Sequence, residues 1–504
     1  MLMVRRRILP GLSMLVIGAS LSGLVSPAWA QQQTAPAPAA QAPQTAAPAA
    51  PTPSAQPPQA APLAPAAPAG EPLTLDQAVA TGVKFNPRVT GSGDTLQASR
   101  ALVTEAYAQN SLTANIQLTH TQVSAVPTFT LPVPAPPPQF VTFETVSFGQ
   151  SQQTQAQVTV AKPLWTGGRI PAAVRQAKAG VSASREDLRR TYQTVNNDVE
   201  HAYYAVLLAE ELVKVADQAT AAAREHLRVA EANLAAGTAP RFDVLRAEAQ
   251  VAQNEQGSIQ ARNGLNLARA ALNNAMGVPQ PRDYQLTSPL ALPQPETTPL
   301  DALVKQAESA RPEVGQAQAQ INAFGGAVDF ARSDKQPTLG VAWIYSKVIN
   351  ASIVQVTNWT LALQASLTIF NGKQTDAAID HARSQQQAAR ALLEQVQQGI
   401  ALQVRQAFLS INSARERVVA ATKGVAQAEE AYRIATVRYN AGVSIGVEVL
   451  DAEAALTAAR SNYAQAVYDY NAATADLEYA VGAWQPPAET PTLRMSPPME
   501  KPKS

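Results

Sequence analysis

A long segment of this chain occurs twice. Residues 165–277 align with residues 370–482 at a constant offset of 205 positions, without insertion or deletion. The matched positions include three pairs of glycines and one pair of apolar dipeptides: Gly167 with Gly372, Gly237 with Gly442, Gly277 with Gly482, and Val244-Leu245 with Val449-Leu450. Self-similarity at a fixed offset indicates one structural unit that is used twice.

Within each copy, apolar residues recur at alternating spacings of four and three residues, the pattern of a coiled coil. It runs from Leu188 to Leu234, broken only at Thr220, and again from Ile400 to Tyr439. A single helix of this kind would be about 100 Å long at ~1.5 Å per residue, which is too long for an ordinary globular domain. A glycine ends each rod and a second helix returns. The pattern predicts two long antiparallel helical hairpins, at 169–277 and 374–482.

Alternation of apolar and polar residues predicts two strands ahead of each hairpin. We expect them at 111–124 and 150–164 in the first copy, and at 337–349 and 353–370 in the second. Strands of about ten residues with one apolar face can cross an outer membrane. The segment 126–149, between the first two strands, is expected to be a long loop.

Large aromatic residues are expected near the strand ends, as at the two rims of a membrane barrel. Trp165 and Phe370 lie where strand gives way to helix, and Trp343, Tyr345 and Trp359 lie toward other strand ends. The alternative is a soluble sheet with ordinary aromatic residues. Four strands are too few for a membrane barrel, and an open sheet edge is not tolerated in lipid. The chain is therefore expected to oligomerise, with eight strands from two copies or twelve from three.

The N-terminal region has the features of an exported protein. Residues 1–30 combine three arginines, an apolar core and Ala-Trp-Ala at the end, as in a secretory signal peptide. No other run approaches the ~20 apolar residues of a membrane helix, so any insertion would use strands. The remaining divisions are predicted as an Ala/Pro-rich disordered linker at 31–70, repeat 1 at 71–284, a crossover linker at 285–298, repeat 2 at 299–484 and a flexible tail at 485–504.

The composition argues against several classes of function. The absence of cysteine excludes disulfides, cysteine-ligated zinc and a lipid anchor on an N-terminal cysteine, and the four histidines show no metal-ligand spacing. Without the three arginines of the leader, the chain has 36 basic and 38 acidic residues, a balance that does not favour nucleic-acid binding. No nucleotide-binding loop, nucleophile–base arrangement or cofactor motif is present. We therefore expect neither an enzyme nor a cofactor-binding protein.

The duplication, the two strands per copy, the aromatic-x-Gly turn into each rod and the Gly-x5-(Asp/Glu)-Val-Leu tip together resemble the TolC-like outer-membrane efflux proteins, over about residues 73–484. The resemblance implies an α+β membrane protein, a trimer in which a twelve-stranded transmembrane β-barrel, with four strands from each chain, continues into a long α-helical coiled-coil tunnel through the periplasm. It implies a location in the outer membrane of a Gram-negative cell. It also implies a passive exit duct of a tripartite efflux pump or a type I secretion system.

The resemblance further implies the partners of such a duct. These are two more copies of the chain, a periplasmic adaptor of the membrane-fusion class, an inner-membrane transporter of the RND, ABC or MFS class, and outer-membrane lipid. The tip turns are expected to dock the adaptor through Gly237, Gly442, Val244, Leu245, Val449 and Leu450. The alternative function is an exported trimeric coiled-coil scaffold or adhesin without a pore. Heat-resistant trimers that conduct ions in planar bilayers would distinguish the two.

A pair of acidic residues lines the narrowest point of the tunnel in the family, and Glu448 and Asp451 occupy those positions here. They are three residues apart and therefore share one side of a helix. In a trimer they would form two acidic rings, which favour cations. The alternative is that they are ordinary acidic residues at a helix start, where the helix dipole stabilises them.

The closed state of the family has a latch of tyrosine and arginine from the second tip and aspartate from the first. Tyr439 and Asp243 match the tyrosine and the aspartate. The arginine position holds Ser444, so Arg241 or Arg438 would have to substitute for it.

Overall fold

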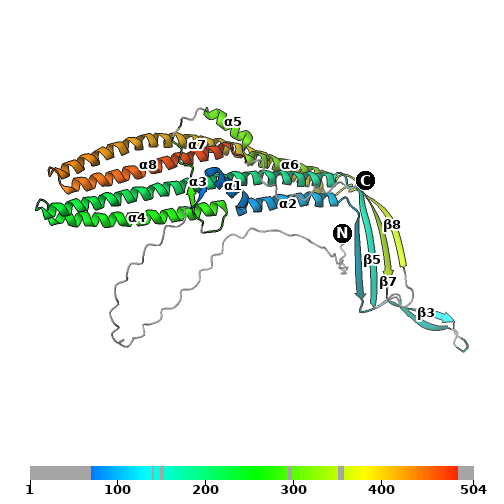
Figure 1. Ribbon diagram of the computed structural model, residues 1–504. Coiled ribbons are helices and arrows are strands. Elements are labelled where there is room, and N and C mark those ends of the chain that lie inside the picture. Colours follow the sequence, from blue (N-terminus) through cyan, green and yellow to red (C-terminus); the bar gives the residue numbers. More distant parts are fainter. Residues whose placement is uncertain are drawn as a thin grey trace, which may run out of the picture. The chain divides into compact units, whose positions relative to one another are not determined.

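The computed structural model describes residues 70–485, apart from 135, 139–140, 148–151, 281, 293, 295–297 and 350–356. The predicted signal peptide, the predicted linker up to residue 69 and the predicted tail beyond residue 485 lie outside these residues. In chain order the elements are β1 (Glu71–Leu73), α1 (Leu75–Phe85), α2 (Pro87–Ala108), β2 (Thr113–Gln122), β3 (Thr128–Pro134), β4 (Val141–Ser147), β5 (Gln152–Trp165), α3 (Arg169–Ala235), α4 (Arg241–Met276), β6 (Tyr284–Leu286), α5 (Leu300–Ala310), α6 (Pro312–Ser333), β7 (Thr338–Val348), β8 (Thr357–Ser366), α7 (Gln374–Asn440) and α8 (Gly446–Val481) (Figure 1).

The long paired helices expected from the heptad pattern are present in both copies. α3 packs against α4, α7 packs against α8, and α3 also contacts α8, so the two hairpins lie side by side (Figure 1). The heptad positions form their cores: Val199 and Val404 are fully buried. The polar interruption at Thr220 is also buried, and its hydroxyl donates a hydrogen bond of 2.8 Å to the carbonyl oxygen of Ala216. The heptad therefore continues through this residue, because its hydroxyl is satisfied within its own helix.

The shorter helices extend each hairpin toward the sheet. α2 packs on α3, and α6 packs on both α3 and α7. Asn86 caps α2 by accepting a hydrogen bond from the backbone N–H of Arg88, and Pro87 occupies the first helical position, where its missing N–H has no cost. α4 ends at Gly277, directly against the junction of α1 and α2. The helices α4 and α2 thus follow each other along α3.

Four antiparallel strands form one sheet in the order β2-β5-β7-β8. The pairing of β5 with β7 shifts register between Pro163 and Trp165, just before the chain turns into α3. A separate two-stranded sheet pairs β1 with β6 in parallel, at the start of the segment predicted as a crossover linker. Of the described helices, none combines the length and the apolar character that a bilayer crossing requires.

Two expectations from the sequence differ from the structure. The segment 126–149 is not simply a long loop, because β3 and β4 pair within it as an antiparallel hairpin. The proline-rich composition concealed this pairing, although Phe129, Leu131 and Val133 alternate along β3. In the last strand, β8 ends at Ser366 rather than near Phe370, because its partner β7 begins opposite that residue, at Thr338.

Candidate functional site

One face of the four-stranded sheet is apolar across all four strands. Residues directly opposite each other in antiparallel strands point to the same face of a sheet. Two successive rows on this face are Ala114, Val160, Trp343, Leu361 and then Ile116, Val158, Tyr345, Trp359. In the single chain these side chains are exposed or half-buried, and 78% of Ile116 is exposed. An exposed apolar face of this extent is suited to contact with lipid.

The opposite face of the same sheet is predominantly polar. Two of its rows are Asn115, Thr159, Ile344, Thr360 and then Gln117, Gln157, Ser346, Asn358. The amides and hydroxyls of these residues can hydrogen-bond to water. The register thus separates a face suited to hydrocarbon from a face suited to an aqueous interior, as in transmembrane barrels.

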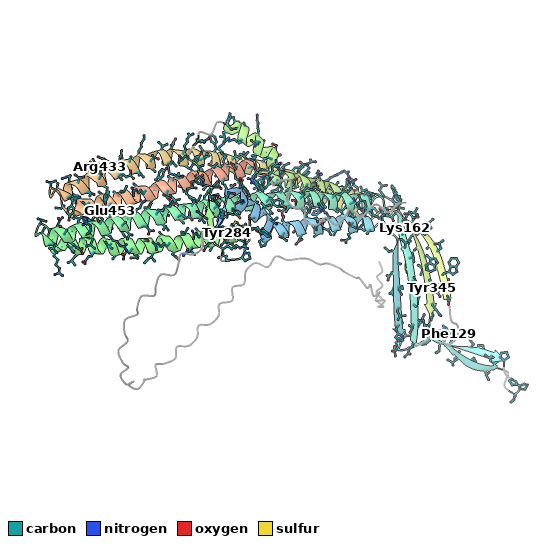
Figure 2. The ribbon with its side chains drawn as sticks, in the orientation of Figure 1. Phe129, Lys162, Tyr284, Tyr345, Arg433 and Glu453 are labelled. Atoms are coloured by element: carbon teal, nitrogen blue, oxygen red, sulfur yellow. The ribbon has the colours of Figure 1, made fainter. Side chains whose placement is uncertain are left out.

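Two lysines interrupt the apolar face. Lys162 lies on β5, near the helices, and Lys347 lies near the other end of the sheet, on β7. Lys162 pairs with Val341 and Lys347 pairs with Ala156. Figure 2 shows Lys162 beside the helices and Tyr345 farther along the sheet. Long lysine side chains can extend from an apolar surface to its polar border. These positions therefore fit the two edges of an apolar band.

The aromatic residues follow the predicted rims only in part. Trp165 ends β5, and Phe370 lies in the turn between β8 and α7. Trp359 pairs with Tyr345 toward the other end of the sheet. The prediction that Trp343 lies toward a strand end is wrong, because β7 stays paired with β5 as far as Val348. Its ring instead stacks on that of Tyr345, with centroids 6.2 Å apart, in the middle of the apolar face.

The other candidate site is at the helix tips, where Gly237 and Gly442 adopt left-handed backbone conformations that end α3 and α7. Both acidic residues of the predicted pair, Glu448 and Asp451, are exposed on the first turns of α8. The Ser444 hydroxyl donates a hydrogen bond of 2.6 Å to the Glu448 carboxylate. Arg438 also approaches this carboxylate, at 3.5 Å. These contacts leave Asp451 as the more open acid of the pair.

The predicted latch is not assembled within the single chain. In the part of the chain that the structure describes, no hydrogen bond or ion pair joins Asp243 to Tyr439, Arg241 or Arg438. The Tyr439 side chain is buried, and within the described part of the chain its hydroxyl oxygen has no hydrogen-bond partner. Its ring packs on that of His226, with centroids 5.1 Å apart. This α3–α7 contact was not predicted from the sequence; the available signal was that His226 adjoins the heptad position Leu227.

The apolar residues expected to dock an adaptor are divided between core and surface. Val244 and Val449 are buried in the apolar clusters of the two tips, and Leu450 is buried as well, so these three side chains offer little surface to an adaptor. Leu245 is exposed and so remains available for the predicted docking, and both tip glycines are exposed. Three further apolar side chains with at least 64% exposure surround them: Phe242, Val443 and Ile445. Heptad spacing continues through each tip, which is why the buried positions recur so close to the turn.

The contact between His226 and Tyr439 is expected to weaken in acid. Burial lowers the pKa of His226 from its usual 6.5, although the nearby Asp243 carboxylate opposes this effect. The folded tip therefore disfavours protonation of His226. The contribution of neutral His226 to the stability of the tip is present above pH 6.5 and is lost as the pH falls below this value. Hydrogen exchange, corrected for intrinsic rates, should show faster opening of the tips at pH 5.5 than at pH 7.5. His226→Gln should remove this difference; an unchanged difference would assign it to another group.

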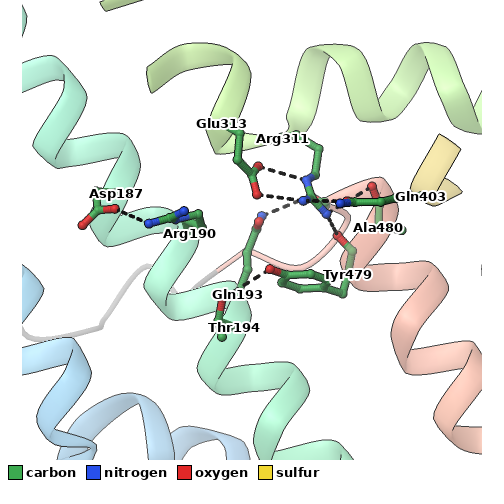
Figure 3. Close-up of polar contacts among 10 residues, drawn as sticks. Asp187, Arg190, Gln193, Thr194, Arg311, Glu313, Gln403, Tyr479 and Ala480 are labelled. Atoms are coloured by element: carbon green, nitrogen blue, oxygen red, sulfur yellow. Dashed lines mark hydrogen bonds and ion pairs between the residues drawn. The ribbon is translucent and has the colours of Figure 1, made fainter. Parts of the chain in front are cut away.

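A buried arginine joins the middle helices of the second copy (Figure 3). The Arg311 guanidinium binds both carboxylate oxygens of Glu313, at 2.7 and 2.9 Å, and donates to the Tyr479 carbonyl oxygen at 2.9 Å. Asn86 occupies the equivalent place in the first copy and donates to the carbonyl oxygen of Ala275 at 2.8 Å. Each side chain therefore links the C-terminal end of a returning helix to the start of a shorter helix, α4 to α2 in the first copy and α8 to α6 in the second.

The comparisons with known proteins agree with this architecture. Residues 66–278 and 303–483 match the outer membrane efflux protein family. Protein CyaE of Bordetella pertussis (strain Tohama I) is 27% identical over 311 residues, which cover 61% of this chain and 66% of CyaE, slightly under two thirds of its length. Outer membrane efflux protein BepC of Brucella suis biovar 1 is 24% identical over 354 residues, or 68% of this chain and 77% of BepC.

The fold is shared with solved outer-membrane channels. The structure of the outer-membrane channel OprN matches with a TM-score of 0.65 at 20% identity, over 81% of this chain and 89% of OprN. The matched family segments include both copies of the strand pair and both helical hairpins. The predicted resemblance is thus confirmed, and with it the prediction of a transport protein rather than an enzyme. The chain belongs to the outer membrane efflux protein family.

Proposed function

We propose that three copies of this chain form the outer-membrane duct of an efflux pump or a type I secretion system. The observation that carries this proposal is the sheet, which has an apolar face, a polar face and, among the described residues, two unpaired edges on β2 and β8. Unpaired backbone groups are too costly in lipid for an open sheet to insert. Pairing of β8 with β2 of the next copy removes both edges, and these strands are matched at ten residues each.

Three copies account for the polar face better than two. An eight-stranded barrel has an interior that side chains fill, whereas larger barrels enclose water. Glutamine, asparagine and threonine side chains on the inner face have partners in a water-filled barrel of twelve strands. The helical hairpins that follow each strand pair then surround the continuation of the same channel.

The helix tips provide the proposed surface for a periplasmic adaptor. Phe242 and Leu245 on the first tip, with Val443 and Ile445 on the second, give each copy four exposed apolar side chains beside the turns. Exposed apolar residues with a polar border are typical of protein interaction sites. Energy for transport would come from an inner-membrane transporter of the RND, ABC or MFS class, since the duct itself is passive.

The acidic pair at the second tip provides a test of this function. Single channels of the purified protein in planar bilayers should conduct ions, and a trivalent cation such as La3+ should block them from the side of the tips. Glu448→Ala with Asp451→Ala removes six carboxylates from a trimer, so about tenfold more La3+ or above should be needed for block. Removing Asp301 and Glu308, which are exposed on α5, deletes the same charge away from the tips and should leave block unchanged.

The outcomes test two hypotheses separately: that the protein is a duct, and that the acidic pair binds the blocking cation. Failure of the wild-type protein to conduct would contradict the proposed function and favour a scaffold without a pore. Conduction with block that is equal in both double variants would retain the duct but reject the acidic rings.

A further inference from the structure

A cavity of about 490 Å³ lies where α1, α3 and α8 meet, in the middle of the helical region. One part of its lining is apolar and aromatic, with Val79 and Val83 from α1, Tyr204 from α3, and Trp484 just after α8. The volume is within the range of small-molecule sites, which combine apolar walls with a few polar groups. None of the residues that line the cavity belongs to the tips or to the four-stranded sheet. The proposed duct gives this cavity no role.

Three carboxylates converge on this cavity from three helices. Asp76 comes from α1, Glu200 from α3 and Glu478 from α8. Glu200 is 8% exposed, and burial together with the charges of Glu478 and Asp76 raises its pKa to about 7. Burial also raises the pKa of Glu478. Among the described residues that line the cavity, none is a lysine or an arginine, so these acids have no basic partner there.

A buried amide completes the negative side of the cavity. Asn196 lines it one helical turn before Glu200 and is only 4% exposed. Its side-chain N–H donates to the Glu200 carboxylate at 3.1 Å, while its buried carbonyl oxygen has no hydrogen-bond partner among the residues that the structure describes. A buried acceptor without a partner costs about 1–3 kcal/mol, which a bound donor would recover. This oxygen therefore indicates a missing hydrogen-bond donor, independently of the acidic cluster, and the surrounding carboxylates favour a donor with a positive charge.

We propose that this cavity binds an organic ammonium ion, with its nitrogen beside Glu200, Glu478 and the Asn196 carbonyl oxygen and its apolar part against Tyr204 and Trp484. The aromatic rings offer cation–π contact, and the valines of α1 cover the hydrocarbon part. A bare metal ion fits less well, because in the described part of the chain no three acidic or histidine side chains are placed to coordinate one. An ammonium ion needs hydrogen-bond acceptors, which the three groups supply without a fixed coordination geometry.

Calorimetric titration of the full chain in detergent tests this site, with phenethylammonium as the probe. The neutral analogue 2-phenylethanol has nearly the same shape and should not bind measurably. Glu200→Gln and Glu478→Gln should each weaken binding about tenfold or more, since each removes a charged acceptor. Glu105→Gln, on the exposed face of α2, is the matched control and should bind as the wild type does.

The affinity should also depend on pH in a defined direction. The charged groups that face Glu200 are Asp76 on α1, Glu478 on α8 and His201 on α3. His201 is paired with Asp476, at 2.9 Å. Because the ammonium ion binds the deprotonated acids, affinity for phenethylammonium should fall between pH 8 and pH 6. Equal binding of phenethylammonium and phenylethanol by the wild-type chain would overturn the proposal, as would binding of Ca2+ with no binding of the amine. The titration is independent of channel activity, so its failure would leave the proposed duct untouched.

Discussion

Replacing Gly277 by alanine is expected to destabilise the protein by about 2–5 kcal/mol. Gly277 has a φ of 68°, and left-handed backbone costs an alanine about 1–2 kcal/mol. An added Cβ would also lie 2.6 Å from the Cα of Asn86 and 2.7 Å from the carbonyl oxygen of Phe85. These are backbone atoms at the junction of α1 and α2, so relief requires the helices to separate, at a further cost of about 1–3 kcal/mol.

Gly237→Ala is the matched control for this substitution. Gly237 has a φ of 73°, but no atom lies within 4 Å of the position of its added Cβ. It should therefore lose only the backbone term, about 1–2 kcal/mol. The midpoint of denaturant unfolding in detergent, followed by far-ultraviolet circular dichroism, measures both variants. Equal losses of stability would show that the close approach of α4 to α2 does not contribute.

The periodic parts of this chain could be predicted from the sequence because periodicity determines which side chains are buried. The spacing of four and three residues gave the helical hairpins, and alternation gave the four strands and their apolar face. The exact strand ends could not be predicted, because they depend on the partner strand. Trp343 illustrates this: its place in the middle of the sheet follows from pairing with Leu361 on the next strand and with Val160, which is distant in sequence.

The candidate sites were less predictable than the fold. Position in the repeat located the tips correctly, but it did not distinguish the exposed Leu245 from the buried Leu450, because the burial of each depends on the neighbouring helix. The contact of His226 with Tyr439 joins α3 to α7, and its only sequence signal is that each residue lies at or beside a heptad position. The acidic cavity is assembled from three separate helices. Each of its carboxylates, considered alone, resembles an ordinary acid on a helix surface.

The Arg311 site shows how the two copies diverged around one structural requirement. Asn86 and Arg311 both precede the proline that starts the next helix, and both reach equivalent carbonyl oxygens, those of Ala275 and Ala480. The arginine side chain is 4% exposed and its charge is matched by Glu313. The Tyr479 ring, 4.9 Å from the guanidinium carbon, covers its face. The second copy thus has a buried ion pair at the junction where the first copy has a neutral amide.

Arg311→Ala is expected to destabilise the protein by about 3–5 kcal/mol, because removing one member of a buried ion pair leaves its partner and the helix-end carbonyls without a donor. Arg311→Lys should recover part of this loss, since lysine retains the charge but not the planar pair of N–H donors that binds both oxygens of Glu313. Denaturant midpoints in detergent measure both variants.

Arg88→Ala is the control for loss of an arginine ion pair at the same level of the bundle. Arg88 and Asp198 form a 2.7 Å pair, but their side chains are 65% and 42% exposed, so its loss should cost at most about 1 kcal/mol. If Arg311→Ala were no more costly than Arg88→Ala, the buried arginine would not hold the junction. The end of α8 would then be fixed by its remaining contacts with α3, α5 and α7, and the symmetry with Asn86 would be one of position without a shared role.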